Sequence, residues 1–348
     1  MISLNKKSSL RNSLFLLLLS FQIQAQKNNS STYDYAYDFE DGMAKVLGFD
    51  SEEGYIDKNG NEVIPLGKFK FSDHSYSNGL KTIRIPSGSE TKYGFIDKNG
   101  TIKIEPIYEN AYPFKDGLAA VQKNGKWGYI DTNGKTVINF KYKRISFFSE
   151  GLASVALDEK YGYINQKGEL IIPYQYDWTF GFTEGLAKVN DGYKSTYYIN
   201  TKGERKFADN TNDLNNGEFS SGLAIIKQND KDGFINKEGK IVILPSYDKA
   251  YKFSGDIAIV IINRKYVLID KKGSVISNQS YDDALYFKNG LCSVKLNKKW
   301  GCVDATGKIV IPIIYDRIGS FSEGLLSVNL NGKNFYIDQN NNCKIFCD

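Results

Sequence analysis

The chain has 348 residues, with 24 tyrosines, 21 phenylalanines, 32 glycines and a single histidine. Hydrophobic residues make up 41% of it, which is typical of a globular or repeat protein rather than a disordered one. The 45 basic and 40 acidic side chains nearly balance, so the composition excludes bulk phosphate binding and we expect no nucleic-acid partner. Because His74 is the single histidine, any metal or catalytic site that needs two histidines is excluded.

The N-terminus has the layout of a secretory signal peptide over residues 1–25. Three basic residues within the first 11 precede an apolar stretch at residues 14–21, and Ile23 and Ala25 occupy the −3 and −1 positions of a cleavage site before Gln26. The apolar stretch is too short to span a bilayer, which takes about 20 residues. We therefore expect an exported chain in the periplasm, at the cell surface or outside the cell. It would begin with a short linker at 26–32 and have no transmembrane span after cleavage.

Internal repetition dominates the chain from residue 33 onward. A glycine followed by a short apolar strand, a GYID-like segment and a VI(x)P-type strand recur in phase. The glycines are 33 to 38 residues apart: Gly42, Gly79, Gly117, Gly151, Gly185, Gly222, Gly255, Gly290 and Gly324. Residues 33–348 are thus predicted to form a single β-repeat domain of about nine units.

Each unit is predicted to be a three-stranded antiparallel meander, as residues 117–142 illustrate. Asn124-Gly125 lies between two apolar runs and is a strong signal for a short hairpin, because glycine adopts positive φ and asparagine tolerates it. Gly134 marks a second chain reversal before the third strand. No helical periodicity of useful length follows the signal peptide, so the fold class is all-β.

The hairpin register predicts how the units stack. With the turn at 124–125, Val121 opposes Gly128 and Ala119 opposes Ile130 on one face. The other face carries Leu118, Ala120, Trp127 and Tyr129. Both faces bear apolar groups, so each small sheet needs cover on both sides, and the neighbouring units are the source of that cover.

Two arrangements of the stacked units are open. A propeller blade of the WD40 type has four strands in about 40–45 residues, whereas these units have three predicted strands in fewer residues. No strand is left over to clasp the two ends together. We therefore favour an open, solenoid-like superhelix, with a closed β-propeller-like ring as the alternative.

All four cysteines lie in the last fifth of the chain: Cys292, Cys302, Cys343 and Cys347. An exported chain allows disulfides among them. In the hairpin register, Cys292 opposes Val303 and Cys302 opposes Ser293, on opposite faces, so a bridge between these two cysteines needs a bulge. The other two are four residues apart on a predicted strand, about 13 Å, which is too far to bridge unless the segment turns.

Two segments, KWGYID (126–131) and KWGCVD (299–304), are each followed by a turn glycine and a third strand. They resemble the WG-repeat, or KWG-repeat, proteins of bacteria. Other residues stand at the tryptophan position in seven units: Glu53, Tyr93, Tyr161, Thr196, Asp232, Tyr266 and Asn334. Three units lack the glycine: they have Tyr197, Val267 and Phe335. The resemblance implies a β-repeat architecture and little about activity, because the motif residues are structural.

Repeated carboxylates are weak candidates for catalysis. An acidic residue precedes the signature glycine in five units: Asp41, Asp116, Glu150, Glu184 and Glu323. Acid and base roles require two different environments, whereas this residue recurs in one place, so a turn role is favoured. The DKNG turns at 57–61 and 97–101 lack the later oxygen ligands of a calcium loop. We expect no cofactor and no metal site.

Exposed aromatic residues are the better candidates for ligand contact. Trp127 and Trp300 occupy the signature position, where packing between repeats is favoured over stacking on a ligand. Trp178 lies outside the tryptophan signature and is the stronger candidate for an exposed contact. Two inserts, 86–92 and 204–218, interrupt the repeat and could line a binding surface. His74 is expected in a surface loop.

These observations favour an exported, non-enzymatic repeat scaffold that binds a protein partner or a cell-surface component. The alternative is a glycan-binding module that uses exposed aromatic residues. The third possibility is an enzyme of the glycoside hydrolase type, with carboxylates from the 204–218 insert: Asp209, Asp213 and Glu218.

Overall fold

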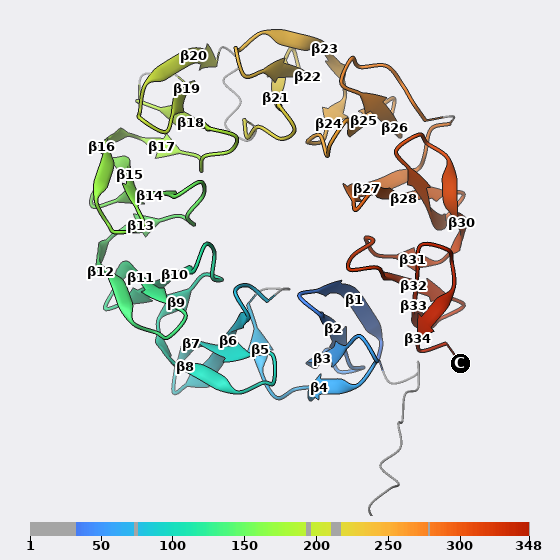
Figure 1. Ribbon diagram of the computed structural model, residues 1–348, viewed down its shortest axis with the longest axis horizontal. Helices are drawn as coiled ribbons and strands as arrows, with labels where there is room; N and C mark the ends of the chain where they lie inside the picture. Colours follow the sequence, from blue (N-terminus) through green and yellow to red (C-terminus); the bar gives the residue numbers. More distant parts are fainter. Residues whose placement is uncertain (1–32, 73–75, 193–195, 210–216, 278, 348) are drawn as a thin grey trace, which may run out of the picture.

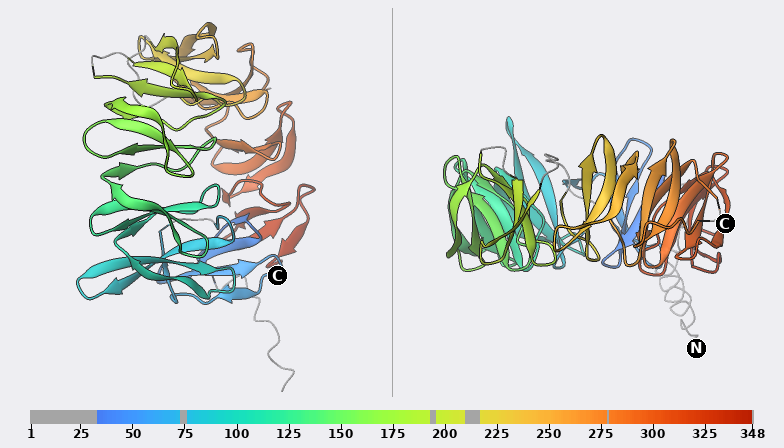
Figure 2. Two further views of the ribbon diagram at one scale, coloured as in Figure 1. Left: turned by 60° about the vertical axis from the view of Figure 1, so that its left-hand side comes forward. Right: turned by 90° about the horizontal axis from the view of Figure 1, so that it is seen from above.

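The protein forms a closed ring of nine blades in the computed structural model, which describes residues 33–72, 76–192, 196–209, 217–277 and 279–347 (Figure 1). All regular elements in these residues are strands, arranged in nine small antiparallel sheets. Seen from above, the ring is a disc about one blade thick (Figure 2). The all-β fold of nine repeated units is confirmed. The closed ring, our alternative arrangement, is the one observed, and the favoured open superhelix was wrong.

The blades follow the chain in order. Blade 1 contains β1 (Tyr35–Glu40), β2 (Met43–Leu47), β3 (Glu53–Asp57) and β4 (Glu62–Ile64). Blade 2 contains β5 (Lys70–Phe71), β6 (Leu80–Ser87), β7 (Glu90–Asp97) and β8 (Ile102–Tyr108). Blade 3 contains β9 (Asn110–Ala111), β10 (Leu118–Lys123), β11 (Lys126–Asp131) and β12 (Thr136–Tyr142). Blade 4 contains β13 (Arg144–Ile145), β14 (Leu152–Ala156), β15 (Tyr161–Asn165) and β16 (Leu170–Tyr176). Blade 5 contains β17 (Trp178–Thr179), β18 (Leu186–Asn190), β19 (Thr196–Asn200) and β20 (Arg205–Asp209).

The second half of the ring is less regular. Blade 6 contains β21 (Leu223–Gln228), β22 (Lys231–Asn236) and β23 (Ile241–Tyr247). Blade 7 contains β24 (Lys249–Ala250), β25 (Ile257–Ile262) and β26 (Lys265–Asp270). Blade 8 contains β27 (Asp283–Lys288), β28 (Leu291–Leu296), β29 (Lys299–Asp304) and β30 (Ile309–Tyr315). Blade 9 contains β31 (Arg317–Ile318), β32 (Leu326–Leu330), β33 (Lys333–Ile337) and β34 (Cys343–Ile345).

Most blades have a fourth strand that the sequence did not predict. In each four-stranded blade the first and last strands form the two edges of the sheet, and the last strand lies at the rim of the ring (Figure 1); we call the first strand the inner strand. In blade 4 this inner strand pairs Arg144 with Ala156 and Ile145 with Val155. A two-residue strand is too short to show the alternation of period two by which strands are recognised.

The predicted hairpin register is confirmed. Val121 pairs with Gly128 and Ala119 with Ile130 across β10 and β11. Nine apolar clusters fill the nine junctions between blades, each with residues from both neighbours. The two faces of blade 3 illustrate this, because Ala119 packs towards blade 2 and Tyr129 towards blade 4. The units therefore stack as predicted and share their cores with their neighbours.

The outermost strand explains the glycine of the WG signature. In β11 only Gly128 separates Trp127 from Tyr129, whereas three residues of β12 separate their partners, Tyr142 and Ile138. The resulting bulge places the carbonyl oxygen of Ile138 2.6 Å from where a Cβ of residue 128 would stand. In five other blades the equivalent isoleucine carbonyl lies 2.5–2.8 Å from the Cβ position of the signature glycine: Gly54, Gly94, Gly162, Gly233 and Gly301. No side chain fits there, so the residue has to be glycine.

The three units without this glycine have different outer strands. In blade 5, Tyr197 pairs directly with Ala208, so no bulge faces it. In blade 7, where Val267 replaces the glycine, isolated bridges stand in place of a continuous outer strand. In blade 9, β34 ends before it reaches the level of Phe335. The departures from the signature are therefore consequences of the local backbone.

The ring closes between blades 9 and 1 by contacts of the same kind as those at the other junctions. Phe39 packs against Tyr336 with ring centroids 4.8 Å apart, and the equivalent pair between blades 4 and 5, Phe182 and Tyr163, is 4.9 Å apart. At both junctions the tyrosine hydroxyl donates to a backbone carbonyl of the next blade at 2.7 Å. Each sheet consists of strands consecutive in the chain, so closure needs no clasp strand.

A carboxylate also crosses this seam. Asp38 of blade 1 accepts hydrogen bonds from the backbone N–H of Ser320 (2.9 Å) and the hydroxyl of Ser327 (3.1 Å) of blade 9. Residue 319 is glycine, and a Cβ there would overlap the carboxylate. Burial raises the pKa of Asp38 above its ordinary value, and the two hydrogen bonds only partly oppose this effect.

Asp38→Asn is expected to alter how stability depends on pH. The raised pKa means that the folded chain binds a proton at Asp38 more tightly than the unfolded chain does. The stability contributed by this residue therefore falls as pH rises through the folded pKa. The difference in unfolding free energy, wild type minus variant, should fall between about pH 3 and pH 7. Urea unfolding of both proteins across this range measures it, and a difference that is constant or rises with pH would contradict the account.

Cys343 and Cys347 form a disulfide, because the segment turns, which is the condition under which we expected a bridge between them to be possible. The strand ends at Ile345, and Phe346 adopts φ 58°, which turns the chain and brings the two Cα atoms to 5.6 Å. The turn places Phe346 against Tyr33 of blade 1, with ring centroids 5.8 Å apart. The disulfide therefore fixes a turn that packs at the seam.

Cys347→Ser is expected to lower the free energy of unfolding by about 2 kcal/mol, the chain-entropy value for so short a loop. The free energy of unfolding of the wild type should fall by the same amount in a reductant such as dithiothreitol. The reductant should leave the variant unchanged, which serves as the internal control. Equal effects of reductant on both proteins would show that the stabilisation does not come from this bond.

Candidate functional site

The repeated carboxylates before the signature glycines belong to tight turns. Asp116 and Gly117 both have positive φ, 51° and 83°, as the two central residues of a hairpin turn of type I′. Three of the carboxylates also accept hydrogen bonds from the next blade's glycine N–H: Glu150 from Gly185 (2.9 Å), Glu184 from Gly222 (2.9 Å) and Glu323 from Gly42 (3.0 Å). These groups hold neighbouring blades together, and the last of them crosses the seam.

The electrostatics of these turns favour the charged form of their glutamate side chains. Lys237 lies 3.1 Å from Glu184, and Lys58 lies 2.9 Å from Glu323. Partial burial raises the pKa of Glu184, but the lysine and the glycine N–H outweigh it and hold the pKa below its ordinary value. A carboxylate in this state is a poor general acid at neutral pH.

The DKNG turns use their aspartate internally. One oxygen of Asp57 accepts hydrogen bonds from the backbone N–H groups of Asn59 and Asn61, both at 2.9 Å. Asp97 makes the same two bonds in blade 2. Within the described part of the chain, no group of three or more histidine, cysteine or acidic side chains is suited to hold a metal ion.

The tryptophan position of the signature lies at the junction with the next blade. Trp127 is buried and stacks on Tyr112, with centroids 5.0 Å apart. Polar residues at this position bond to the next blade's backbone: Glu53 accepts from Phe71 N (3.1 Å), Asp232 accepts from Ala250 N (2.8 Å), and Asn334 donates to Tyr33 O and Asp34 O (3.1 Å each). The position therefore serves inter-blade contact whichever residue fills it.

The structure does not bring the three tryptophans together. Trp300 is half-buried at the blade 8–9 junction, with the Lys295 ammonium 5.4 Å from its ring centroid. Trp178 begins β17, is half-buried and packs edge-on against Phe180 at 5.5 Å. It occupies the recurring first position of the inner strand, where blade 4 has Arg144. The three residues thus lie in different blades.

The inserts and the histidine are described only in part. Residues 86–92 lengthen the hairpin of β6 and β7, whose last pair is Ser87 with Glu90, rather than forming a separate loop. Glu218 forms an ion pair with Lys252 of blade 7. His74 and Asp213 lie outside the described residues, as does the side chain of Asp209.

The remaining cysteines are free and buried on opposite faces of blade 8, in the predicted register: Cys292 opposite Val303 and Cys302 opposite Ser293. Burial raises the pKa of the Cys302 thiol to about 11 and raises the pKa of Cys292 as well. Buried thiols with raised pKa values are poor nucleophiles.

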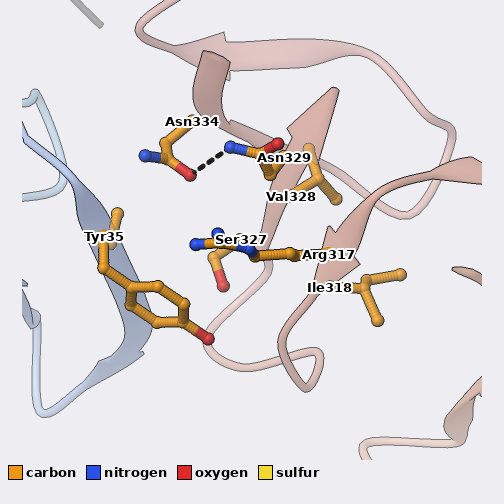
Figure 3. A pocket seen from close by; sticks show the side chains of 8 residues that line it. Tyr35, Arg317, Ile318, Ser327, Val328, Asn329 and Asn334 are labelled. Carbon is orange, nitrogen blue, oxygen red and sulfur yellow. Dashed lines mark hydrogen bonds between the residues drawn. The ribbon is translucent and has the colours of Figure 1, made fainter. Parts of the chain in front are cut away.

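A small cavity lies at the seam between blades 9 and 1 (Figure 3). Tyr35 faces Arg317 across it, and the side chains of Asn329 and Asn334 are joined by a hydrogen bond of 2.8 Å. Its volume of about 10 Å³ has room for a single water at most, so it is not a ligand site.

A larger cleft opens between blades 7 and 8. Two cavities of about 140 and 220 Å³ share three lining residues, Tyr251, Ile259 and Tyr286, and the larger also contacts Tyr266 and Asp283. Tyr286 is 67% exposed. We call this feature, defined by these five residues, the blade 7–8 cleft, and it is the candidate functional site.

The blade 3–4 junction shows why this cleft is open. The same three positions hold Tyr112, Trp127 and Phe147 there, and Tyr112 lies 5.0 Å from Trp127 and 5.1 Å from Phe147. In the blade 7–8 cleft the corresponding distances from Tyr251 are 6.4 Å to Tyr266 and 6.0 Å to Tyr286. A tyrosine in place of the larger tryptophan, on a blade without a continuous outer strand, leaves the aromatic rings apart.

Sequence reasoning missed this cleft because it followed tryptophans. The signal was present in the alignment of the units, which places an aromatic residue at all three positions in these two junctions. The segment after β26, GSVISNQSY (273–281), also lacks the proline-ending third strand found in other units. Aromatic residues and a weakened outer strand in one unit together distinguish the blade 7–8 cleft.

A closed ring of β-blades, held together by its motif residues, is a β-propeller, a class that suggests a scaffold or an interaction module. The family model for the WG containing repeat matches residues 31–47, 54–80, 93–127, 127–161, 161–194, 233–266, 268–300 and 300–333. These segments cover most of the chain, so the chain belongs to the WG-repeat family. The unmatched stretch between 194 and 233 contains the 204–218 insert.

Solved structures resemble the chain at low sequence identity. A crystal structure of a eukaryotic initiation factor superposes with a TM-score of 0.52 at 14% identity, over 72% of this chain and 81% of that one. BamB from Moraxella catarrhalis gives 0.40 at 12% identity, over 87% and 92%. The dihydro-heme d1 dehydrogenase NirN gives 0.43 at 11%, over 96% and 83%. No curated protein sequence matches the chain. The first of these likenesses concerns the fold alone.

Within the described ranges, no helix is both long and apolar enough to cross a bilayer.

Proposed function

We propose that the protein is an exported, non-enzymatic propeller scaffold that binds a protein or a cell-surface component. The observation that carries the proposal is the blade 7–8 cleft, where three tyrosines surround open volume at a junction whose counterpart between blades 3 and 4 is closely packed. Concave sites lined by aromatic rings with a few polar groups are typical of binding sites.

The use of the repeated polar groups supports a non-enzymatic role. The glutamates of the turns bond to neighbouring blades, and the aspartates of the DKNG turns bond to their own backbone. Glu218, the described member of the insert carboxylates, is paired with Lys252. These carboxylates stabilise the ring, which leaves them without the freedom that proton transfer to a substrate requires.

The N-terminal segment and the disulfide support export. Residues 1–25 have the charge and hydropathy pattern of a signal peptide, and disulfides persist in oxidising compartments outside the cytoplasm. N-terminal sequencing of the protein from the producing cell should give a chain beginning at Gln26. A chain that retains Met1 would contradict export through this signal.

Affinity capture tests the binding role. The mature chain, 26–348, would be immobilised and exposed to envelope extract, alongside Tyr286→Ala and the matched control Phe147→Ala, which removes the equivalent ring from the blade 3–4 junction. The proposal predicts a specific component that the wild type and the control retain and Tyr286→Ala loses. Capture of nothing, or equal capture by all three proteins, would contradict a binding role for the cleft.

A further inference from the structure

The polar groups of the blade 7–8 cleft define the chemistry of its ligand. Burial, together with hydrogen bonds to Tyr251 and Asp283, raises the pKa of the Tyr266 hydroxyl to about 12. The phenol is therefore protonated at neutral pH and already hydrogen-bonded within the cleft. Asp283, half-buried at the start of β27, accepts a hydrogen bond from the backbone N–H of Ala284 at 2.9 Å, and its carboxylate has further lone pairs for a ligand. Phenol and carboxylate therefore face the same volume.

Charges of both signs surround the cleft, since Lys252 lines the smaller cavity and Asp283 the larger, so its net charge favours neither a cationic nor an anionic ligand. The ammonium of Lys249 already stands 5.0 Å from the ring centroid of Tyr251, so a cationic ligand on that ring would lie near a like charge. An anionic ligand would meet the carboxylate of Asp283. A purely apolar ligand would displace water from Asp283 and from the tyrosine hydroxyls, and it could not replace the hydrogen bonds that the water makes to them. A neutral ligand that carries several hydroxyl groups avoids all three penalties.

The shape of the cleft agrees with a ring-shaped ligand. Tyr251 and Tyr266 are nearly parallel, with an interplanar angle of 21°, and Tyr286 stands almost perpendicular to Tyr251 at 81°. The exposed ring of Tyr286 can lie against one face of a ligand. The two cavities together reach the lower end of the ~300–1,000 Å³ range of small-molecule sites.

We propose that the blade 7–8 cleft binds a neutral sugar unit of a glycan, with Tyr286 stacking on the sugar ring and Asp283 accepting hydrogen bonds from its hydroxyls. This inference rests on the proposed binding function and gives its ligand a chemical class. It places the sugar site away from all three tryptophans. The equivalent residues at the blade 3–4 junction pack against one another instead of lining a cleft.

Titration calorimetry with four neutral tetrasaccharides, cello-, malto-, xylo- and chitotetraose, tests the inference on the mature chain. At least one sugar should bind, and Tyr286→Ala should weaken its binding about tenfold or more through loss of the stacking ring. Asp283→Asn should weaken it by a similar factor through loss of a charged acceptor. Phe147→Ala should bind as the wild type does.

The same variants separate this inference from the proposed function. Absence of binding by all four sugars, binding that survives Tyr286→Ala, or equal loss in Phe147→Ala would overturn the sugar site. If Tyr286→Ala loses a captured protein partner that none of the sugars displaces, the scaffold proposal stands and the sugar assignment falls. Circular dichroism and thermal melting establish that each variant is folded. If Tyr286→Ala does not fold, Asp283→Asn still tests the sugar site.

Discussion

Phe39→Ala is expected to destabilise the protein by about 3–5 kcal/mol, the usual result of removing a fully buried phenylalanine side chain. Phe39 is 0% exposed because blade 9 covers it, and its ring packs on Tyr336. In an open stack the same residue would lie on the uncovered face of the first unit, where its removal would have little effect. The substitution therefore measures how much the closed seam contributes to stability.

The matched control is Phe182→Ala, at the same position of an internal junction. Phe182 is also 0% exposed and packs on Tyr163 at nearly the same distance. Denaturant unfolding, together with hydrogen exchange in blades 1 and 9, should show similar losses for the two variants. A loss of less than about 1 kcal/mol for Phe39→Ala beside a full loss for Phe182→Ala would contradict a closed ring.

Gly162→Ala is expected to destabilise the protein by about 3 kcal/mol, because an added methyl group there forces the backbone to shift. Its Cβ would stand 2.6 Å from the carbonyl oxygen of Ile172 in the outer strand. Unlike a side chain, a carbonyl within a strand bulge has no alternative rotamer. Denaturant titration of the wild type and of Gly162→Ala measures this change in the free energy of unfolding.

Gly181→Ala is the control for this substitution. The nearest atom to its Cβ position is the Cβ of Ser149 at 3.7 Å, an ordinary contact, and its φ is not positive. It should change stability by less than about 0.5 kcal/mol. Similar effects at the two glycines would show that the steric explanation of the WG signature is incorrect.

Local features of the fold were predictable because local residues determine them. The turn at Asn124-Gly125 and the alternation of residues around it sufficed to predict the pairing of Val121 with Gly128, and to show that both faces need cover. The same reasoning placed Cys292 and Cys302 on opposite faces, where they remain free. Turn glycines and period-two patterns act over a few residues, so a single sequence reveals them.

Ring closure was not predictable from the count of strands. The absence of a clasp strand was inferred correctly, but closure depends on contacts between residues about 300 positions apart, such as the bond from Tyr336 to Tyr37. Most of the inner strands, which add a fourth strand to most blades, have only two residues and are too short to leave a pattern. The disulfide was left open for a related reason, since it depends on whether one residue, Phe346, leaves the extended conformation.

The candidate site depends on differences of about 1 Å between equivalent junctions. Tyr112 and Tyr251 occupy the same position, and the sequence alone shows aromatic neighbours for both. Whether those rings pack closely or leave a cleft depends on ring size and on the neighbouring outer strand. Such a difference becomes visible only when the two junctions are compared in three dimensions.

The distance between the first and last blades tests the closed ring most directly. Spin labels attached to bioorthogonal amino acids at positions 59 and 340, equivalent turns of blades 1 and 9, leave all four cysteines in place, and pulsed electron resonance reports their separation. The closed ring predicts the short distance of adjacent blades, since Gly60 lies against Phe346. An open stack of nine sheets about 10 Å apart would separate the labels by about 80 Å, and that result would contradict the ring.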